Sequence, residues 1–280
     1  MTDTGSENLV LVDVADGIMT LTLNRPERGN GWTSALGRRY FAMLEEGARS
    51  PDVRAIIVTG AGSAFCVGGD SEILGGIADG SRTVVNQDEA QQQGIADYSF
   101  PLRIGKPIIA AVNGACFGIG MQQVLSCDIR IASENAKFST AFARRGLAAE
   151  MGITWLLPRL VGTGHAMDLL LSARLVRAPE AAQIGLVNRV VPHDALMDEA
   201  RTYAAELAGK CAPSSMQIIK DQVWKDLNCT LPESYDRAIG LMTTAFEGDD
   251  FKEGLKSWQE KREPEFAPLS GDSAIAPPAD

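Results

Sequence analysis

Histidine is scarce in this sequence, and cysteine lacks the spacing of a metal or redox site. The two histidines are His165 and His193, and we expect both to be structural, with His165 on a helix surface. The five cysteines are widely scattered: Cys66, Cys116, Cys127, Cys211 and Cys229. Because they are odd in number and form no CxxC pair, they argue against a disulfide framework and a metal site and indicate a reducing compartment.

Positive charge and long apolar runs are also lacking. The 280 residues include 26 Lys and Arg against 36 Asp and Glu, a net charge of −10, which disfavours a nucleic-acid partner. No apolar run approaches the roughly 20 residues of a membrane helix. The first ten residues have neither the basic nor the apolar segment of a secretory signal. We expect a cytoplasmic protein that binds neither membranes nor nucleic acid.

Several common catalytic motifs are absent. No GxGxxG follows a strand, which removes support for a dinucleotide fold, and no GxxxxGK[ST] phosphate loop is present. No serine lies in a GxSxG elbow, which argues against the usual hydrolase nucleophile.

What the sequence does contain is an alternation of β-rich and helical segments. Residues 9–14 and 18–24 are two β-rich runs separated by a turn, which predicts a hairpin. Buried strands and helices are predicted to follow: strands over 55–59, 107–112 and 128–132, and helices over 32–49 and 120–127. This alternation is typical of an α/β fold.

Strand signals fade after residue 192. Four helices are predicted there, over residues 195–208, 214–227, 231–246 and 249–261. The polar, Gly-rich residues 71–94 predict a mobile loop that runs into a helix. The expected division is an α/β core with the ligand site over 1–195, a helical region over 196–266 and a disordered tail over 267–280.

Three segments carry a more specific pattern. They are LNRPERGN at 23–30, IVTGAGSAFCVGGD at 57–70 and AAVNGACFGIG at 110–120. In this order and spacing they resemble the enoyl-CoA hydratase/isomerase family, or crotonase superfamily, over about residues 9–266. The resemblance implies a crotonase-like ββα superhelix (spiral), a C-terminal helical trimerisation region and an acyl-CoA thioester substrate. It also implies a homotrimer or a hexamer (a dimer of trimers), and no cofactor, since coenzyme A is part of the substrate.

Two of these segments are Gly-rich turns that leave a buried strand and open toward a helix. Backbone N–H groups at a helix start lack partners within the helix, and two of them could hold a thioester oxygen as it gains enolate charge. The resemblance assigns this oxyanion hole to the N–H groups of Gly69 and Ile119, where Ile119 replaces the usual glycine. It makes Cys66, Val67 and Gly68 substrate contacts. Taken singly, each turn is also explained as a tight connection.

Other positions are similar to residues that hold coenzyme A. The resemblance implies that Trp258 and Lys261 contact its adenine and phosphate, often from a neighbouring subunit. Arg28 adds positive charge beside Arg25. The alternatives are packing within the chain for Trp258 and a solvated helix end for Lys261, where the helix dipole stabilises a cation.

Two positions argue against hydration. Hydratases of the family carry two glutamates that add water across a double bond, and the matching positions here are Gln122 and Phe142. Neither side chain transfers a proton usefully, which leaves Gln122 to orient a ligand or a water.

Glu150 remains as a candidate base. It lies in GLAAEMGITWLLPR at 146–159, which is similar to the segment that carries the single base of the family's isomerases. One base suffices for a 1,3-proton shift, and apolar neighbours such as Met151 and Ile153 would raise its pKa. The alternative is that Glu150 lies in the first turn of the helix that contains Trp155. There it would stabilise that helix by about 0.3–1 kcal/mol.

The sequence therefore predicts an enoyl-CoA isomerase with Glu150 as its catalytic base. Two alternatives stay open: an enoyl-CoA hydratase of low activity in fatty acid β-oxidation, and an acyl-CoA binding protein without catalysis. Two further acids are expected to be structural, Asp70 as a helix cap and Asp128 as a buried acid.

Overall fold

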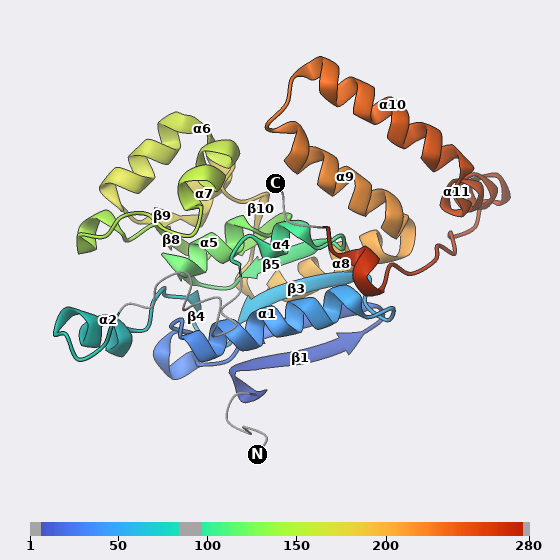
Figure 1. Cartoon of the computed structure of the whole chain (residues 1–280). Helices are drawn as coiled ribbons and strands as arrows, with labels where there is room; N and C mark the ends of the chain where they lie inside the picture. Colours follow the sequence, from blue (N-terminus) through green and yellow to red (C-terminus); the bar gives the residue numbers. More distant parts are fainter. Residues whose placement is uncertain (1–6, 84–96, 277–280) are drawn as a thin grey trace.

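The computed structural model describes residues 7–83 and 97–276 (Figure 1). Part of the loop expected over 71–94 and the last residues of the expected tail, 277–280, lie outside the described residues. Within the described ranges, no helix combines the length and the apolar character needed to cross a lipid bilayer.

The N-terminal hairpin and the first helix form where the sequence places them. β1 (Val10–Ala15) pairs antiparallel with β2 (Ile18–Leu23). α1 (Ser34–Arg49) begins after Thr33, whose side chain caps the helix by accepting a hydrogen bond from Leu36 N–H. Both predictions are confirmed. These elements could be predicted because each depends on a pattern within its own residues.

The remaining strands build two sheets. Their bounds are β3 (Ala55–Gly60), β4 (Ala64–Cys66), β5 (Ile108–Val112), β6 (Ala115–Phe117), β7 (Ile129–Ser133), β8 (Lys137–Ser139), β9 (Val176–Arg177) and β10 (Arg189–Val191). The larger sheet has the order β1-β2-β3-β5-β7-β10 and the smaller sheet the order β4-β6-β8-β9. The pairs β3–β4, β5–β6 and β7–β8 each give one strand to the larger sheet and one to the smaller sheet. Within the larger sheet β3, β5 and β7 run parallel, and within the smaller sheet β4, β6 and β8 run parallel. This repeat is the predicted ββα spiral, and the α/β fold class is confirmed.

Helices cover both faces of the larger sheet. Ile56 and Val58 share an apolar cluster with residues of α1, whereas Ala55 and Ile57 share one with residues of α8 (Leu196–Lys210). A strand covered on both faces buries every side chain, which explains the continuous apolar run at this strand.

The other helices fall into two groups (Figure 1). The spiral carries α2 (Ser71–Ala78), α4 (Phe100–Arg103), α5 (Ile119–Leu125), α6 (Ile153–Ser172) and α7 (Ala178–Gln183). The C-terminal region consists of α8, α9 (Pro213–Asp226), α10 (Leu231–Glu247) and α11 (Asp249–Glu260). The four predicted C-terminal helices are therefore present, and their ends differ from the prediction by at most two residues.

Two expectations drawn from the sequence differ from the structure. Residues 71–78 are helical, because Asp70 caps α2 by accepting a hydrogen bond from Glu72 N–H at 3.0 Å. Residues 267–276, expected to be disordered, dock on the spiral instead: Ala274 is fully buried and Ile275 forms a β-bridge with Ile104. These contacts join segments far apart in the sequence, so composition alone gives no sign of them.

Candidate active site

The two Gly-rich turns meet at one edge of the smaller sheet. β4 and β6 are parallel neighbours, so the segments that follow them leave from the same edge. Gly68 and Gly118 in these segments have φ angles of 95° and 51°. A Cβ atom on Gly68 would lie 3.2 Å from the carbonyl oxygen of Phe117, and one on Gly118 would lie 3.8 Å from Gly68 Cα. The turns are thus in contact, which the absence of side chains allows.

Each turn offers one backbone N–H group. Trp32 N–H donates to the Gly68 carbonyl at 2.7 Å, and Asp70 N–H donates to the Trp32 carbonyl at 3.0 Å, which leaves Gly69 N–H between them. Ile119 is the first residue of α5, so its N–H group has no acceptor within the helix. In the part of the chain that the structure describes, neither amide donates to a backbone carbonyl. The arrangement supplies the two donors that an oxyanion hole requires.

A cavity of about 660 Å³ lies over the first turn. Its lining includes Arg28, Val67, Gly69, Phe117 and Arg145. The volume is in the range of small-molecule sites. Gly69, which carries one of the two candidate donors, therefore borders a space that is large enough for a ligand.

Asp70 organises the charges beside this cavity. Its carboxylate caps α2 and lies 2.9 Å from Arg25 and 3.3 Å from Arg28, which is also 3.1 Å from Glu72. Burial opposes ionisation, but the hydrogen bonds from Glu72 N–H and the two arginines hold the pKa of Asp70 below its ordinary value. The predicted cap is confirmed, and the positive charge expected of Arg28 is partly offset by two carboxylates.

The cysteines beneath the turns fill space. Cys66 and Cys116 are fully buried. Burial raises the pKa of the Cys66 thiol to about 12, so it stays protonated and is a poor nucleophile. The buried Cys66 side chain therefore supports the turn, and its contact with a ligand stays a prediction.

Asp128 and His193, two of the other residues expected to be structural, make hydrogen bonds within the fold. Asp128 accepts a hydrogen bond from Ile108 N–H at 2.8 Å and lies 2.8 Å from Lys220. His165 is exposed on α6, and His193 Nδ1 lies 3.0 Å from Ser133 Oγ at the end of β7. Neither histidine lines the cavity over Gly69.

The positions of the hydratase glutamates hold groups that do not exchange protons. Gln122 is 1% exposed, and its amide donates to the Tyr98 carbonyl at 3.3 Å and to Ser126 Oγ at 3.1 Å. Its carbonyl accepts a hydrogen bond from Gln123 at 2.6 Å. Phe142 is buried in the main apolar cluster. Gln122 thus fixes neighbouring segments, and neither residue supplies an acid.

Glu150 lies in the segment between β8, which ends at Ser139, and α6. α6 begins at Ile153 after Gly152 and has no acidic residue in its first turn, so the first-turn role of Glu150 is wrong. Met151 has a φ angle of 54°, a strained conformation for a non-glycine residue. The Glu150 side chain reaches solvent, but burial around its carboxyl group raises its pKa.

Tyr98 connects these parts, and no pattern in the sequence pointed to it. Its hydroxyl accepts a hydrogen bond from Trp32 Nε1 at 3.2 Å, and its carbonyl accepts the bond from Gln122. Burial raises the pKa of Tyr98, and the charge of Glu150 raises it further. Tyr98 therefore experiences the charge of Glu150. It is also hydrogen-bonded to Trp32, which pairs with Gly69, and to Gln122 of α5, the helix that begins at Ile119.

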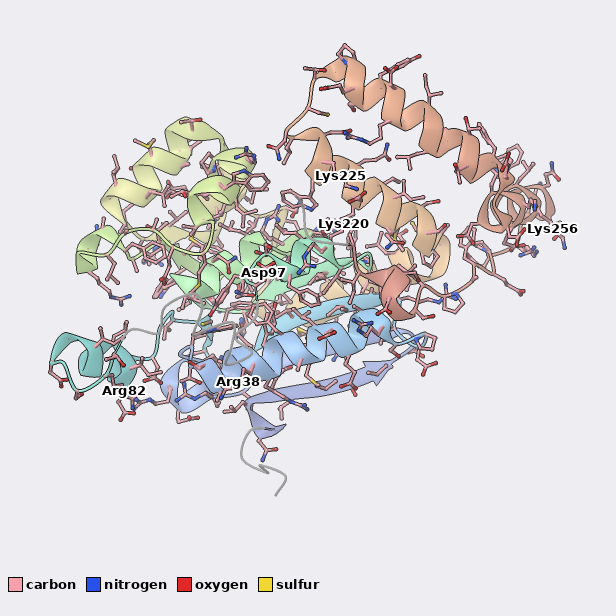
Figure 2. The ribbon with its side chains drawn as sticks, in the orientation of Figure 1. Arg38, Arg82, Asp97, Lys220, Lys225 and Lys256 are labelled. Atoms are coloured by element: carbon pink, nitrogen blue, oxygen red, sulfur yellow. The ribbon has the colours of Figure 1, made fainter. Side chains whose placement is uncertain are left out.

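Trp258 and Lys261 lie elsewhere in the chain. They line a separate cavity of about 600 Å³ on α11. Figures 1 and 2 show α11, marked by Lys256, at the opposite end of the molecule from α2, which Arg82 follows. Trp258 is 76% exposed, so the alternative of packing within the chain is wrong. Within one chain these two residues do not meet the Gly-rich turns.

Comparisons with known proteins agree with this geometry. The family model for enoyl-CoA hydratase/isomerase matches residues 13–268. A relative from Rhodobacter capsulatus, named a probable enoyl-CoA hydratase, is 36% identical, covering 93% of this chain and 98% of the relative. The 1,2-epoxyphenylacetyl-CoA isomerase of Escherichia coli is 34% identical, covering 92% of this chain and 97% of the relative.

A solved structure shows the same fold. The crystal structure of a probable enoyl-CoA hydratase/isomerase from Mycobacterium abscessus has a TM-score of 0.82 at 30% identity, covering 92% of this chain and 98% of that one. With the spiral of two sheets and the paired Gly-rich turns, these matches establish the relationship. The chain belongs to the enoyl-CoA hydratase/isomerase family, the crotonase superfamily.

Proposed function

We propose that this protein is an enoyl-CoA isomerase that moves a double bond by a 1,3-proton shift. The observation that supports the proposal is that Gln122 and Phe142 occupy the hydratase positions without an acid, while the charge of Glu150 acts on Tyr98, whose hydroxyl is hydrogen-bonded to the Trp32 side chain. One carboxylate is enough for a proton shift, whereas hydration also needs a positioned water and a second acid–base group.

The proposed reaction begins at C2 of a 3-enoyl-CoA thioester. The Glu150 carboxylate takes a C2 proton, and the electron pair moves into the thioester to form a dienolate. The N–H groups of Gly69 and Ile119 donate to the oxygen that gains this charge. Glu150 then returns the proton at C4, which gives the conjugated 2-enoyl product. No cofactor takes part, because coenzyme A is carried by the substrate.

The experiment compares three activities in the same preparation. We expect a 3-enoyl-CoA to give a conjugated 2-enoyl thioester, followed by its ultraviolet absorbance, and we expect a 2-enoyl-CoA to be hydrated far more slowly. A hydratase, as the Rhodobacter capsulatus relative is named, would show the reverse ratio. Binding of both thioesters without deuterium exchange at C2 in deuterated water would instead identify a non-catalytic acyl-CoA binder.

The acid limb of the pH profile tests the same base. Burial raises the pKa of Glu150 above the ordinary value of 4.5. The reaction needs the ionised carboxylate, so kcat/KM should fall as the pH drops through this raised pKa and stay high above it. The measurement is kcat/KM for a 3-enoyl-CoA from about pH 4 to 8 in buffers of constant ionic strength. An acid limb at or below 4.5 would contradict the assignment.

We further propose that α9–α11 assemble the chain into a homotrimer or a hexamer of two trimers. α10 has no buried residue in the single chain. Its large exposed apolar residues recur every three or four positions and form one stripe: Leu231, Tyr235, Ile239, Met242 and Phe246. We propose a second copy as the occupant of this stripe, since the resemblance to the family implies that Trp258 and Lys261 contact coenzyme A at a neighbouring subunit.

The assembly is tested by light scattering. We expect the Ile239→Glu/Phe246→Glu variant to run as a monomer, because each charge would be desolvated in the contact. Thr244→Glu, which changes an exposed residue of the same helix outside the stripe, should keep the wild-type mass. A wild-type protein that is itself monomeric at micromolar concentration would refute the assembly.

A further inference from the structure

A polar cavity lies at the end of the smaller sheet that is opposite the Gly-rich turns. Its volume is about 390 Å³, and its lining includes Ser63, Asn113 and Asn135, which come shortly before β4, β6 and β8. The Gly-rich turns follow β4 and β6, so these strands, three residues long, separate the two sites by about 10 Å. Every residue of the lining is polar or charged, and none of these residues lines the cavity over Gly69.

Two basic residues of the lining lie directly opposite each other in the smaller sheet. Lys137 of β8 pairs antiparallel with Arg177 of β9, and the next pair of the register, Phe138 and Val176, is buried. Since side chains alternate along a strand, Lys137 and Arg177 both project to the other, exposed face. The Cβ atoms of such a pair are about 4.5–5.5 Å apart, so two like charges there repel each other and destabilise the pairing.

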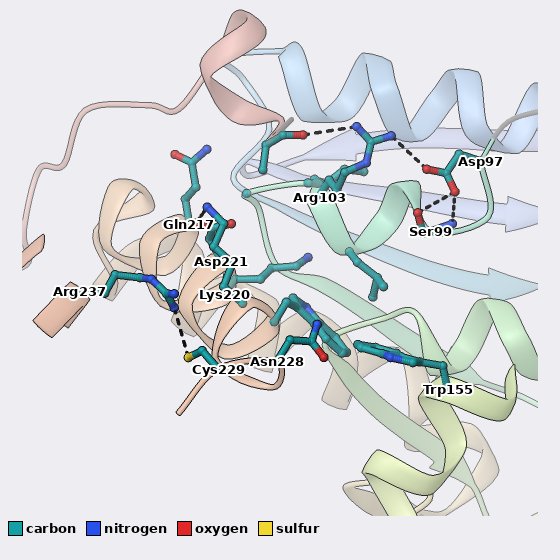
Figure 3. A pocket seen from close by; sticks show the side chains of 16 residues that line it. Asp97, Ser99, Arg103, Trp155, Gln217, Lys220, Asp221, Asn228, Cys229 and Arg237 are labelled. Atoms are coloured by element: carbon teal, nitrogen blue, oxygen red, sulfur yellow. Dashed lines mark hydrogen bonds and ion pairs between the residues drawn. The ribbon is translucent and has the colours of Figure 1, made fainter. Parts of the chain in front are cut away.

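Neither Lys137 nor Arg177 forms an ion pair in the parts of the chain that the structure describes. The cavity where α9 meets the spiral, shown in Figure 3, is different, because each basic side chain of its lining has a carboxylate partner. The pairs there are Arg103–Asp97, Lys220–Asp128, Lys225–Asp221 and Arg237–Asp226. A bound anion would neutralise Lys137 and Arg177 as these carboxylates neutralise their partners.

Other polar groups surround the two cations. His193 Nδ1 lies 3.0 Å from Ser133 Oγ, which leaves Nε2 as the ring nitrogen for a ligand. Ser63 and Asn135 add a hydroxyl and a side-chain amide. Glu134, the acidic residue of the lining, is exposed and would accept a hydrogen bond from a ligand hydroxyl. Because all of the described lining residues are polar, an acyl chain or an adenine ring would gain little here.

We propose that this cavity is a second ligand site, which binds a dianionic phosphate group, either free or as the ester of a small polar compound. Two cations on adjacent strands match two negative charges, and the donors around them match several oxygens of one phosphate. The volume of about 390 Å³ is within the range of small-molecule sites, so it also admits a phosphate ester. The site does not depend on the thioester site proposed at Gly69 and Ile119.

The test is calorimetry on the full chain with inorganic phosphate, glycerol 3-phosphate and acetate at constant ionic strength. Both phosphates should bind, and acetate, with a single charge, should bind at least about tenfold more weakly. Tighter binding of glycerol 3-phosphate would identify an ester as the ligand, and tighter binding of inorganic phosphate the free ion. Lys137→Gln and Arg177→Gln should each weaken both phosphates by about tenfold, through loss of a charge-assisted hydrogen bond. Arg201→Gln removes the same charge from an exposed position of α8 outside the lining and should have no effect.

Thermal unfolding separates ligand binding from a structural role. Without phosphate, Lys137→Gln should unfold at the temperature of the wild type or above it, because one of two like charges is gone. Phosphate should raise the Tm of the wild type more than that of the variant. Failure of both phosphates to bind the wild type, or undiminished binding by both variants, would overturn the inference and leave the proposed isomerase intact. Loss of binding only in Arg145→Gln would instead assign the phosphate to the cavity over Gly69.

Discussion

Glu150→Gln is expected to lower turnover of a 3-enoyl-CoA by about 10²–10⁴-fold, the usual contribution of a general base. Glutamine has the size of glutamate but cannot accept the C2 proton, so the change removes the chemistry and keeps the shape. Gln122 and Phe142 offer no substitute carboxylate, which places the loss toward the upper end. Affinity for a saturated acyl-CoA should stay within about twofold, because in the proposed reaction the thioester oxygen is held by backbone amides and not by Glu150.

The control for this variant is Glu206→Gln. Glu206 is exposed on α8, pairs with Lys210 and is not part of the cavity over Gly69, so its substitution should leave turnover unchanged. Both rates are measured from the appearance of the conjugated product, and affinity from calorimetry. Full turnover by Glu150→Gln would remove Glu150 as the base. Loss of binding together with turnover would assign it a structural role instead.

Gly118→Ala is expected to lower kcat by about 10²–10³-fold, the cost of losing one oxyanion donor. Gly118 has φ 51° and ψ −117°, a combination that is nearly restricted to glycine. An alanine there costs about 1–3 kcal/mol of strain, which the chain relieves by rotating the peptide that carries Ile119 N–H. The base remains in place, so the pH at which the acid limb falls should not move. Steady-state kinetics and thermal unfolding measure the two effects.

The matched control is Gly271→Ala. Gly271 also has a positive φ angle, 63°, and a methyl group added there would meet no other atom within 4 Å. Its substitution should therefore cost stability but no activity. The comparison separates general destabilisation from displacement of the donor. If Gly118→Ala matched the control in kcat while losing the same stability, Ile119 N–H would not be an oxyanion donor.

The elements of this fold that carry local signals were predictable. The hairpin of β1 and β2, helix α1 and the strand β3 each follow from the pattern of their own residues. The docked segment around Ala274 was not predictable, because it is held by Ile104 and other residues far away in the sequence. The pattern after Asp70 does not predict α2, because Gly75 and Gly76 lower the helix propensity of this short segment.

The candidate site divides in the same way. The Gly-rich turns were predictable, since their glycines are required by positive φ angles and by the close approach of two backbones. The hydrogen bonds of Tyr98 to Trp32 and Gln122 were not predictable, because a single tyrosine after a polar segment forms no recognisable pattern. The separation of Trp258 from the turns was also hidden, since a motif gives order along the chain and not distance in space.

The sequence by itself determined which groups are available: two glycine turns that free backbone amides, and one carboxylate, Glu150, outside the two positions that carry the glutamates of the family's hydratases. Only the tertiary structure decided how these groups meet. Parallel pairing of β4 and β6 brings the two Gly-rich turns into contact, and burial raises the pKa of Glu150. Neither effect is encoded locally, because both the contact and the desolvation exist only after the chain has folded.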